Sequence, residues 1–272
     1  LEQLMLEHHP NDPAIQTVLG DKELYDKDKA AALEHYKKSL ELNPNNEEVL
    51  QGTISLMFEL RKDFSDIEKY TVLSTEEFPE KPEFWFFDGT SKLAQKKYKE
   101  AETSFLKALE LNKGNNKQLE VLVRGQLGDT FHSLKKKEEA YEAYDKVLAI
   151  NPDNDHILNN YAYFLSLDKV DLEKAKDMSE KLVSKHPENA TYLDTHAWVL
   201  FQLKDYENAL KYMEKALGNQ SEPSPVMFEH YGDILYKLGN KQKAIDYWQK
   251  ADGLGDASDL LDKKIKEQKY YE

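Results

Sequence analysis

The 272-residue chain contains no cysteine. It therefore has no disulfide framework, no thiolate metal ligand and no thiol nucleophile. It also has no apolar run close to the roughly 20 residues that a membrane-spanning helix requires. These absences remove several function classes, but they do not fix the compartment in which the protein works.

Positive charge is in deficit. The chain has 37 Lys and Arg residues against 51 Asp and Glu residues, which gives a formal net charge of -14 at pH 7. An acidic surface repels nucleic-acid backbones and anionic membranes. We therefore expect no nucleic-acid partner and no direct membrane span, and we expect any charged partner to be basic.

The common motifs of catalysis are missing as well. The sequence has no HExxH, GxGxxG, GxxxxGK[ST] or GxSxG pattern, and its eight histidines form no pair at i, i+4. The stretch at 151–155 starts like a calcium loop, but His156 stands where such a loop needs glycine. The sequence predicts no enzyme activity, no metal site and no cofactor.

What the chain does have is a repeated pattern of small and aromatic residues. Small or aliphatic residues recur 34 to 39 positions apart at Ala32, Ile67, Ala101, Ala140, Ala175, Ala209 and Ala244. Twelve residues before them stand Gly20, Ser55, Gly89, Gly128, Tyr163, Ala197 and Gly232, and four residues after them stand Tyr36, Thr71, Phe105, Tyr144, Ser179, Met213 and Trp248. Four of them are also followed, twelve residues later, by Pro44, Pro79, Pro152 and Pro187. Such a register predicts pairs of closely packed helices that end at proline.

This register resembles the tetratricopeptide repeat (TPR) signature, and Trp85, Gly89, Ala101, Phe105 and Ala108 match it best. The resemblance implies an all-α, right-handed superhelical solenoid of antiparallel helix pairs. Seven units are expected over 13–256, at about 13–47, 48–81, 82–120, 121–155, 156–189, 190–224 and 225–256. Residues 1–12 are expected to be the second helix of a truncated upstream repeat. Residues 257–272 are expected to form a capping helix, with Leu260, Leu261 and Ile265 on its apolar edge and a lysine-rich polar face.

The resemblance also indicates where a partner would bind. In TPR arrays the first helix of each unit lines a concave groove, through its second, fifth, ninth and twelfth positions. The candidate groove residues are Phe86, Asp129, His132, Asn160, Phe164, Asp194, Trp198, Phe201, Glu229, Asp233 and Tyr236. Leu167 occupies the twelfth position of the fifth unit. The aromatic members either contact a ligand or pack against neighbouring helices, and the sequence leaves both interpretations open.

One TPR ligand class is disfavoured. Repeats that hold the C-terminal carboxylate of heat-shock chaperones use Lys, Arg and Asn at the fifth and ninth positions. Here those positions include Asp129, Asp194, Glu229 and Asp233, and none of them is Lys or Arg. We therefore expect a neutral or basic peptide or protein as the partner.

The first functional hypothesis is a non-enzymatic scaffold that binds a peptide or protein segment in its groove. Alternatives are a C-terminal regulatory or substrate-presenting module of a longer enzyme or envelope assembly machine, and a structural self-associating module. The last three units, which contain ILNNYAYFLS, HAWVLFQLKDY and HYGDILYKLGN, resemble bacterial TPR proteins that are often exported. That resemblance implies a bacterial extracytoplasmic location, in the periplasm or as an outer-membrane lipoprotein.

Overall fold

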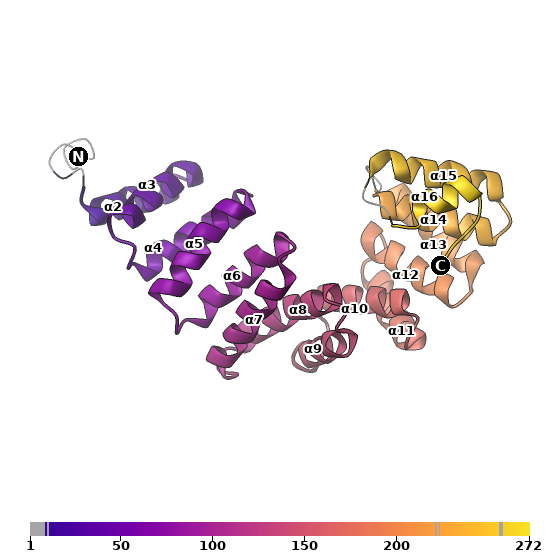
Figure 1. The fold of residues 1–272 in the computed structure, drawn as a ribbon, viewed down its shortest axis with the longest axis horizontal. Coiled ribbons are helices and arrows are strands. Elements are labelled where there is room, and N and C mark those ends of the chain that lie inside the picture. Colours follow the sequence, from indigo (N-terminus) through magenta and orange to yellow (C-terminus); the bar gives the residue numbers. More distant parts are fainter. Residues whose placement is uncertain (1–8, 10, 221, 223, 256–257) are drawn as a thin grey trace. The chain divides into compact units, whose positions relative to one another are not determined.

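A computed structural model describes residue 9 and residues 11–220, 222, 224–255 and 258–272 of the chain. Within these residues it contains fifteen α-helices and no β-strand. The predicted all-α fold of antiparallel helix pairs is confirmed (Figure 1). The helix expected within 1–12 falls almost wholly outside the described residues.

Short polar side chains begin most of the helices. Asn46, for example, accepts a hydrogen bond from the backbone N–H of Val49 at 3.2 Å, and Asn116 accepts one from Leu119 at 3.0 Å. Each such cap pairs one of the N–H groups that the first helical turn leaves without a partner. Helices also begin with a proline in their first turn at Pro13, Pro82 and Pro225.

The chain divides into two compact units, Leu1–Asn151 and Pro152–Glu272. Unit 1 contains α2 (Pro13–Tyr25), α3 (Lys29–Leu42), α4 (Glu47–Glu59), α5 (Phe64–Glu77), α6 (Pro82–Ala94), α7 (Tyr98–Asn112), α8 (Lys117–Ser133) and α9 (Lys137–Ile150). Each helix packs against the next one in sequence, and α6 also contacts α8. Unit 1 is therefore a stack of four helix pairs.

Unit 2 contains α10 (Asp155–Asp168), α11 (Leu172–Lys185), α12 (Ala190–Gln202), α13 (Tyr206–Asn219), α14 (Pro225–Lys237), α15 (Lys241–Leu254) and the short α16 (Leu261–Glu267). The first helices of its three pairs lie side by side, because α12 contacts both α10 and α14. After α15 the chain turns back, and α16 packs against α15. This arrangement places three first helices and the C-terminal segment around a common surface.

The repeated small residues occupy the contacts between paired helices. Ala32, Ile67, Ala101, Ala140, Ala175, Ala209 and Ala244 are all completely buried. Each helix that precedes Pro44, Pro79, Pro152 or Pro187 ends two residues before the proline. Proline cannot continue the helical hydrogen-bond ladder, so it separates successive pairs.

Several helix boundaries differ from the expected unit limits. The helices α4, α8 and α10 begin at Glu47, Lys117 and Asp155, each one to four residues before the limits at 48, 121 and 156. The polar stretch 113–118 follows α7, and its last two residues belong to α8. Asn116 caps that helix, and the Asn112 side chain bonds to the Asn116 backbone.

The turn inside each helix pair has a left-handed residue at the same place. Lysine or arginine adopts this conformation at Lys27, Arg61, Lys96, Lys135, Lys169 and Lys204, with φ between 50° and 67°, whereas the seventh turn has Gly239 at 87°. A side chain in this region is strained relative to glycine. The basic residues lie just after the C-terminal end of each first helix, where their charge complements the helix dipole.

Candidate functional site

The glycines of the first helices are in direct contact with aromatic rings of the second helices. A Cβ atom added at Gly128 would lie 2.4 Å from the Tyr144 ring, and one added at Gly232 would lie 2.5 Å from the Trp248 ring. Gly20 and Gly89 make the same kind of contact with Tyr36 and Phe105. These glycines are therefore required for close helix packing.

The residue after the glycine depends on the aromatic partner. Asp21 accepts a hydrogen bond from the Tyr36 hydroxyl at 2.6 Å, Asp129 from the Tyr144 hydroxyl at 2.5 Å, and Asp233 from the Trp248 Nε1–H at 2.9 Å. Phe105 has no polar tip, and the corresponding residue beside Gly89 is Thr90. The aspartates at the ninth position therefore bind polar aromatic groups of their own repeat.

Three of the candidate groove residues lie in unit 1. Phe86 is half-buried beside Phe87 and Phe105, at ring-centroid distances of 5.8 and 6.3 Å. Asp129 and His132 are also half-buried on α8. The bond from Tyr144 to Asp129 shows that this carboxylate has a structural role, whatever else it contacts.

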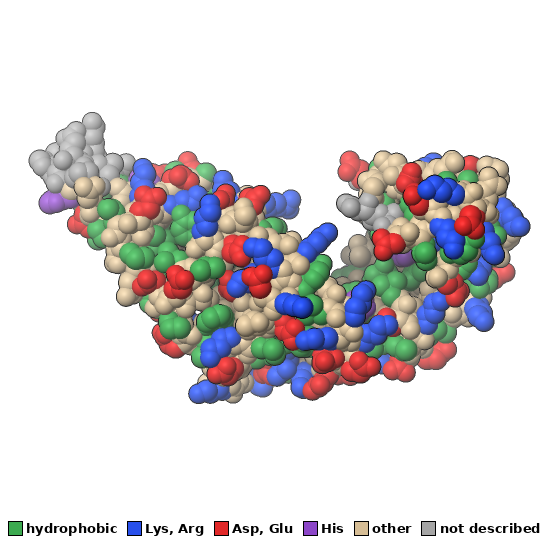
Figure 2. Space-filling model, in the orientation of Figure 1, with side chains coloured by type: hydrophobic (Ala, Val, Ile, Leu, Met, Phe, Trp, Pro, Cys, Tyr) green, Lys and Arg blue, Asp and Glu red, His purple; other side chains and the backbone are tan. Residues whose placement is uncertain are grey.

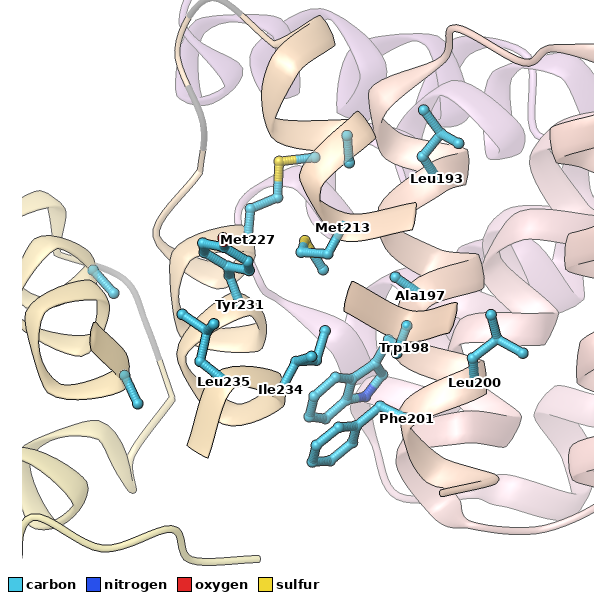
Figure 3. Packing of buried hydrophobic residues seen from close by; sticks show 14 of the residues in the cluster. Leu193, Ala197, Trp198, Leu200, Phe201, Met213, Met227, Tyr231, Ile234 and Leu235 are labelled. Atoms are coloured by element: carbon cyan, nitrogen blue, oxygen red, sulfur yellow. The ribbon is translucent and has the colours of Figure 1, made fainter. Parts of the chain in front are cut away.

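Two of the predicted aromatic residues of unit 2, Trp198 and Phe201, form a stack with His230. The Trp198 ring lies 4.6 Å from Phe201 on the same helix and 3.9 Å from His230 on α14, and it is nearly parallel to both. Figure 3 shows Trp198 and Phe201 side by side near Ile234. Both residues are less than one-tenth exposed, so much of their surface is buried against the protein itself. Burial of both rings favours internal packing, which is one of the two interpretations that the sequence leaves open.

The other predicted residues of unit 2 lie on α10, α12 and α14. Asp194 pairs with His230 Nδ1 at 2.9 Å, Tyr236 stacks on Trp248 at 5.6 Å, and Phe164 lies 6.0 Å from Tyr163. Asn160 is half-buried one turn before Phe164 on α10. Their positions on adjacent first helices agree with the expected register.

The acidic residues of α14 hold a lysine from the C-terminal segment. Lys264 donates to Glu229 Oε1 at 2.8 Å and to the two Asp233 oxygens at 2.9 and 2.6 Å. Glu229 also accepts hydrogen bonds from the Ser258 backbone N–H at 2.9 Å and from the Ser258 hydroxyl. The lysine and both carboxylates are at most 5% exposed. The expectation of a lysine-rich solvating face for 257–272 is therefore wrong at Lys264, because two buried carboxylates pair with it.

Burial and pairing change the acidity of these carboxyl groups in opposite directions. Burial raises the pKa of Asp233 to about 6, although Lys264 partly offsets this effect. Burial also acts to raise the pKa of Glu229, but Lys264 and Ser258 outweigh it, so the net shift is downward. Two carboxylates sharing one ammonium group favour one fully ionised member.

The remainder of the segment follows the first helices back towards α10. The Tyr270 ring makes an edge contact with Phe201 of α12 at 5.7 Å, and Lys237 lies 4.1 Å above the same ring. Beyond it, Glu272 pairs with Lys169 at 2.7 Å. The helix expected over 257–272 is thus shorter, since α16 runs from Leu261 to Glu267 and the residues after it have no regular structure. Residues 256–257 lie outside the described residues.

A pocket of about 380 Å³ lies between this segment and the first helices. The helices contribute Tyr163, Leu167, Trp198, Gln202, Val226, Glu229, His230 and Asp233, and the segment contributes Ser258, Leu260, Lys264, Tyr270, Tyr271 and Glu272, with Lys169 at the end of α10. Predicted groove residues that line it are Trp198, Glu229 and Asp233, together with Leu167. Phe86, Asp129 and His132 belong to unit 1 and have no part in this pocket.

Sequence reasoning missed the residues that close the pocket. Lys264, Tyr270 and Glu272 lie outside the repeats, so the repeat register gives them no position. A signal was nevertheless present, because an acidic pair at Glu229 and Asp233 on one helix face requires a cation if it is buried. The coupling of aspartate to a Tyr or Trp fifteen residues later was also visible in the sequence, at Asp21, Asp129 and Asp233.

Charges of both signs are interspersed on the face shown in Figure 2. No group of three or more His, Asp or Glu residues in the described part of the chain is arranged to hold a metal ion. Among the same residues, none of the helices has the length and apolarity needed to cross a membrane.

Stacked helix pairs of this kind define a helical-repeat protein. A family model described as tetratricopeptide repeat matches residues 88–155, and another, described as the TPR domain of cytochrome c-type biogenesis protein H, matches residues 125–227. The chain belongs to the tetratricopeptide repeat family. No curated protein matches it significantly.

Solved structures share the fold at low sequence identity. A TPR protein from Parabacteroides merdae has a TM-score of 0.71 and 15% identity, over 94% of this chain and 98% of that one. The APC/C assembly Cut9–Hcn1 has a TM-score of 0.67 and 16% identity, over 88% of this chain and 46% of that one. YrrB, described as a TPR protein with an unusual peptide-binding site, has a TM-score of 0.55 and 17% identity, over 77% of this chain and 99% of that one.

Proposed function

We propose that this chain is a non-enzymatic scaffold whose unit 2 binds an extended segment of a partner protein. The observation that carries the proposal is the convergence of three successive first helices on one pocket, through Leu167 of α10, Trp198 of α12 and Glu229 of α14. Aromatic and aliphatic walls with a few polar groups are typical of binding pockets. The peptide-binding site described for YrrB supports the same use of a TPR fold.

The pocket favours a neutral or basic segment. Glu229 and Asp233 are both buried in its wall and are already paired with a cation, Lys264. An anionic group of a partner placed beside these two carboxylates would be repelled by them, because buried charges are poorly screened by solvent. Lys169 lines the pocket and pairs with Glu272, and Lys237 contacts the ring of Tyr270, which is another lining residue.

The rim residue Leu167 provides the test. Its side chain is 40% exposed, so Leu167→Asp changes the pocket with little effect on folding, and Leu254→Asp on α15, at 56% exposure, is a matched control. We expect affinity capture from the native cell to recover the same partner with the wild-type chain and with Leu254→Asp, and about tenfold less with Leu167→Asp. Equal recovery with all three chains would exclude the pocket as the binding site.

A second candidate function is a substrate-presenting module of an envelope assembly machine. The match of residues 125–227 to the TPR domain of cytochrome c-type biogenesis protein H favours it. If the chain has this function, affinity capture from the native cell should recover an unfolded secreted substrate together with membrane-bound assembly proteins. Recovery of folded partners alone would favour the simple scaffold.

We also propose a bacterial extracytoplasmic location, in the periplasm or on the outer membrane. The support for it is the resemblance of the last three repeats to exported TPR proteins. Fractionation of the native cell with an antibody against this chain would test the location, and a cytoplasmic signal would refute it.

A further inference from the structure

The C-terminal segment Ser258–Glu272 covers the surface on which the proposed partner would bind. It contacts three successive first helices of unit 2: Lys264 contacts α14, Tyr270 contacts α12, and Glu272 contacts Lys169 at the end of α10. The contacts progress in order along the segment. A partner peptide lying in the same place would cross the same helices.

Lys264 is the main polar anchor of the segment. Its side chain is 4% exposed, and its ammonium group makes three hydrogen bonds of 2.6 to 2.9 Å to Glu229 and Asp233. The neighbouring Lys266 is 76% exposed and pairs with Asp262, within the segment. The acidic surface thus selects one lysine at one position.

Tyr270 is a second anchor, six residues further on. It contacts Phe201 edge-on and receives Lys237 above its ring at 4.1 Å. An aromatic ring held between an aromatic and a cation is a typical hot-spot arrangement. Together the two anchors define the spacing that the surface recognises, a lysine followed at six residues by an aromatic side chain.

The segment fits this surface incompletely. The pocket of about 380 Å³ remains between it and the helices. Trp198 lines the pocket, and its buried Nε1–H has no hydrogen-bond acceptor among the described residues. A different peptide that fills the pocket would make contacts that the segment does not make.

We propose that unit 2 recognises a lysine-bearing segment of a partner protein and that Ser258–Glu272 occupies the same surface in the free chain as an internal competitor. This inference rests on the proposed function. Because the internal segment is tethered, it acts at an effective concentration of about millimolar. A partner segment must therefore bind more tightly than the internal segment does, and peptides that bind weakly or lack the matching residues are excluded from the surface.

The test uses the full chain and a fluorescent synthetic peptide with the sequence of residues 258–272. In the variant Lys264→Gln the internal segment loses its anchor, while Glu229 and Asp233 remain. We expect this variant to bind the peptide at least about tenfold more tightly than the wild-type chain does. Lys266→Gln, the matched control, should bind like the wild type, and a peptide carrying Lys264→Gln should bind weakly to all three chains.

A variant that keeps the buried ion pair provides a second test. Tyr270→Ala removes the contact with Phe201 without leaving a charge unpaired, so it remains informative if Lys264→Gln does not fold. It should also bind the wild-type peptide more tightly than the wild-type chain does. The inference is wrong if a folded Lys264→Gln chain or the Tyr270→Ala chain binds no better than the wild type.

Two further outcomes separate this inference from the proposed function. If peptide binding is unchanged but Leu167→Asp still loses the captured partner, the internal competitor is excluded and the binding pocket stands. If light scattering shows that the released variants pair with each other, the occupant is a second copy of this chain, and a lysine-bearing partner protein is excluded.

Discussion

Gly128 shows how a single residue determines the separation of two helices. Its missing Cβ leaves room for Tyr144, which is completely buried and held by Asp129. We expect Gly128→Ala to lower the free energy of unfolding by about 2 kcal/mol, because the ring cannot move aside. Urea denaturation followed by circular dichroism would measure the loss.

Gly218 is the matched control for this substitution. It lies in α13, and no atom of the described residues outside its own helical turn would come within 4 Å of a Cβ added there. Gly218→Ala should therefore stabilise the chain by about 0.5–1 kcal/mol, through helix propensity alone. Equal effects of the two substitutions would show that the contact with Tyr144 is unimportant.

His196 gives the chain a pH-dependent contribution to its stability. Burial lowers the pKa of His196 to about 4, and the ring bonds to Ser179 at 2.8 Å and contacts Tyr212. The unfolded chain binds a proton near pH 6.5, so this contribution is complete above that pH and is lost as pH falls towards 4. Between pH 7 and 4.5 the wild type should lose about 2–3 kcal/mol more than His196→Gln.

The comparison between the two chains is needed because Asp233 acts in the opposite direction. Its raised pKa, about 6, makes its ionised form unfavourable in the folded chain, so its contribution falls as pH rises from about 4 to 6. Asp233 is present in both chains, and its effect therefore cancels in the difference. Parallel stability profiles would contradict the low pKa of His196.

At the scale of elements, the turn between the two helices of a pair carries strain. Lys135 has φ of 63° between α8 and α9. Lys135→Gly should raise the free energy of unfolding by about 0.5–1 kcal/mol, because glycine adopts this conformation without strain. Lys146→Gly, within α9, should instead lower it by about 1 kcal/mol. Thermal melting of both variants checks the difference in sign.

The repeated elements were predictable, but the C-terminal one was only partly so. The register of buried small or aliphatic residues predicted the all-α fold of helix pairs, since close packing favours such residues at a fixed spacing. For the last helix, the apolar residue Leu261 was correctly placed at an inner position, and it is 3% exposed. The burial of Lys264 was not predicted, because it depends on partners that lie 35 and 31 residues earlier in the chain.

At the scale of the whole molecule, each repeat of an array is stabilised mainly by contacts with its neighbours, so the array does not unfold as one cooperative block. Gly89→Ala would bring a Cβ within 2.6 Å of Phe105 in unit 1. Hydrogen exchange should become faster in α6, α7 and their neighbours, while α12–α15 in unit 2 keep their protection. Equal acceleration throughout the chain would indicate a single cooperative unit.

The sequence by itself determined the class of protein, because the helix period, the glycine–aromatic pairs of four units and the prolines that follow four units act locally and recur at a fixed spacing. It also led to the prediction that one face of the first helices lines a binding groove. Only the tertiary structure decided what each face does: Asp129 binds Tyr144, whereas Asp233 binds both Trp248 and Lys264. The physical reason is that a buried carboxylate pairs with whichever hydrogen-bond donor lies beside it in the folded chain. The segment that contains Lys264 belongs to no repeat, so the repeat spacing does not place this lysine.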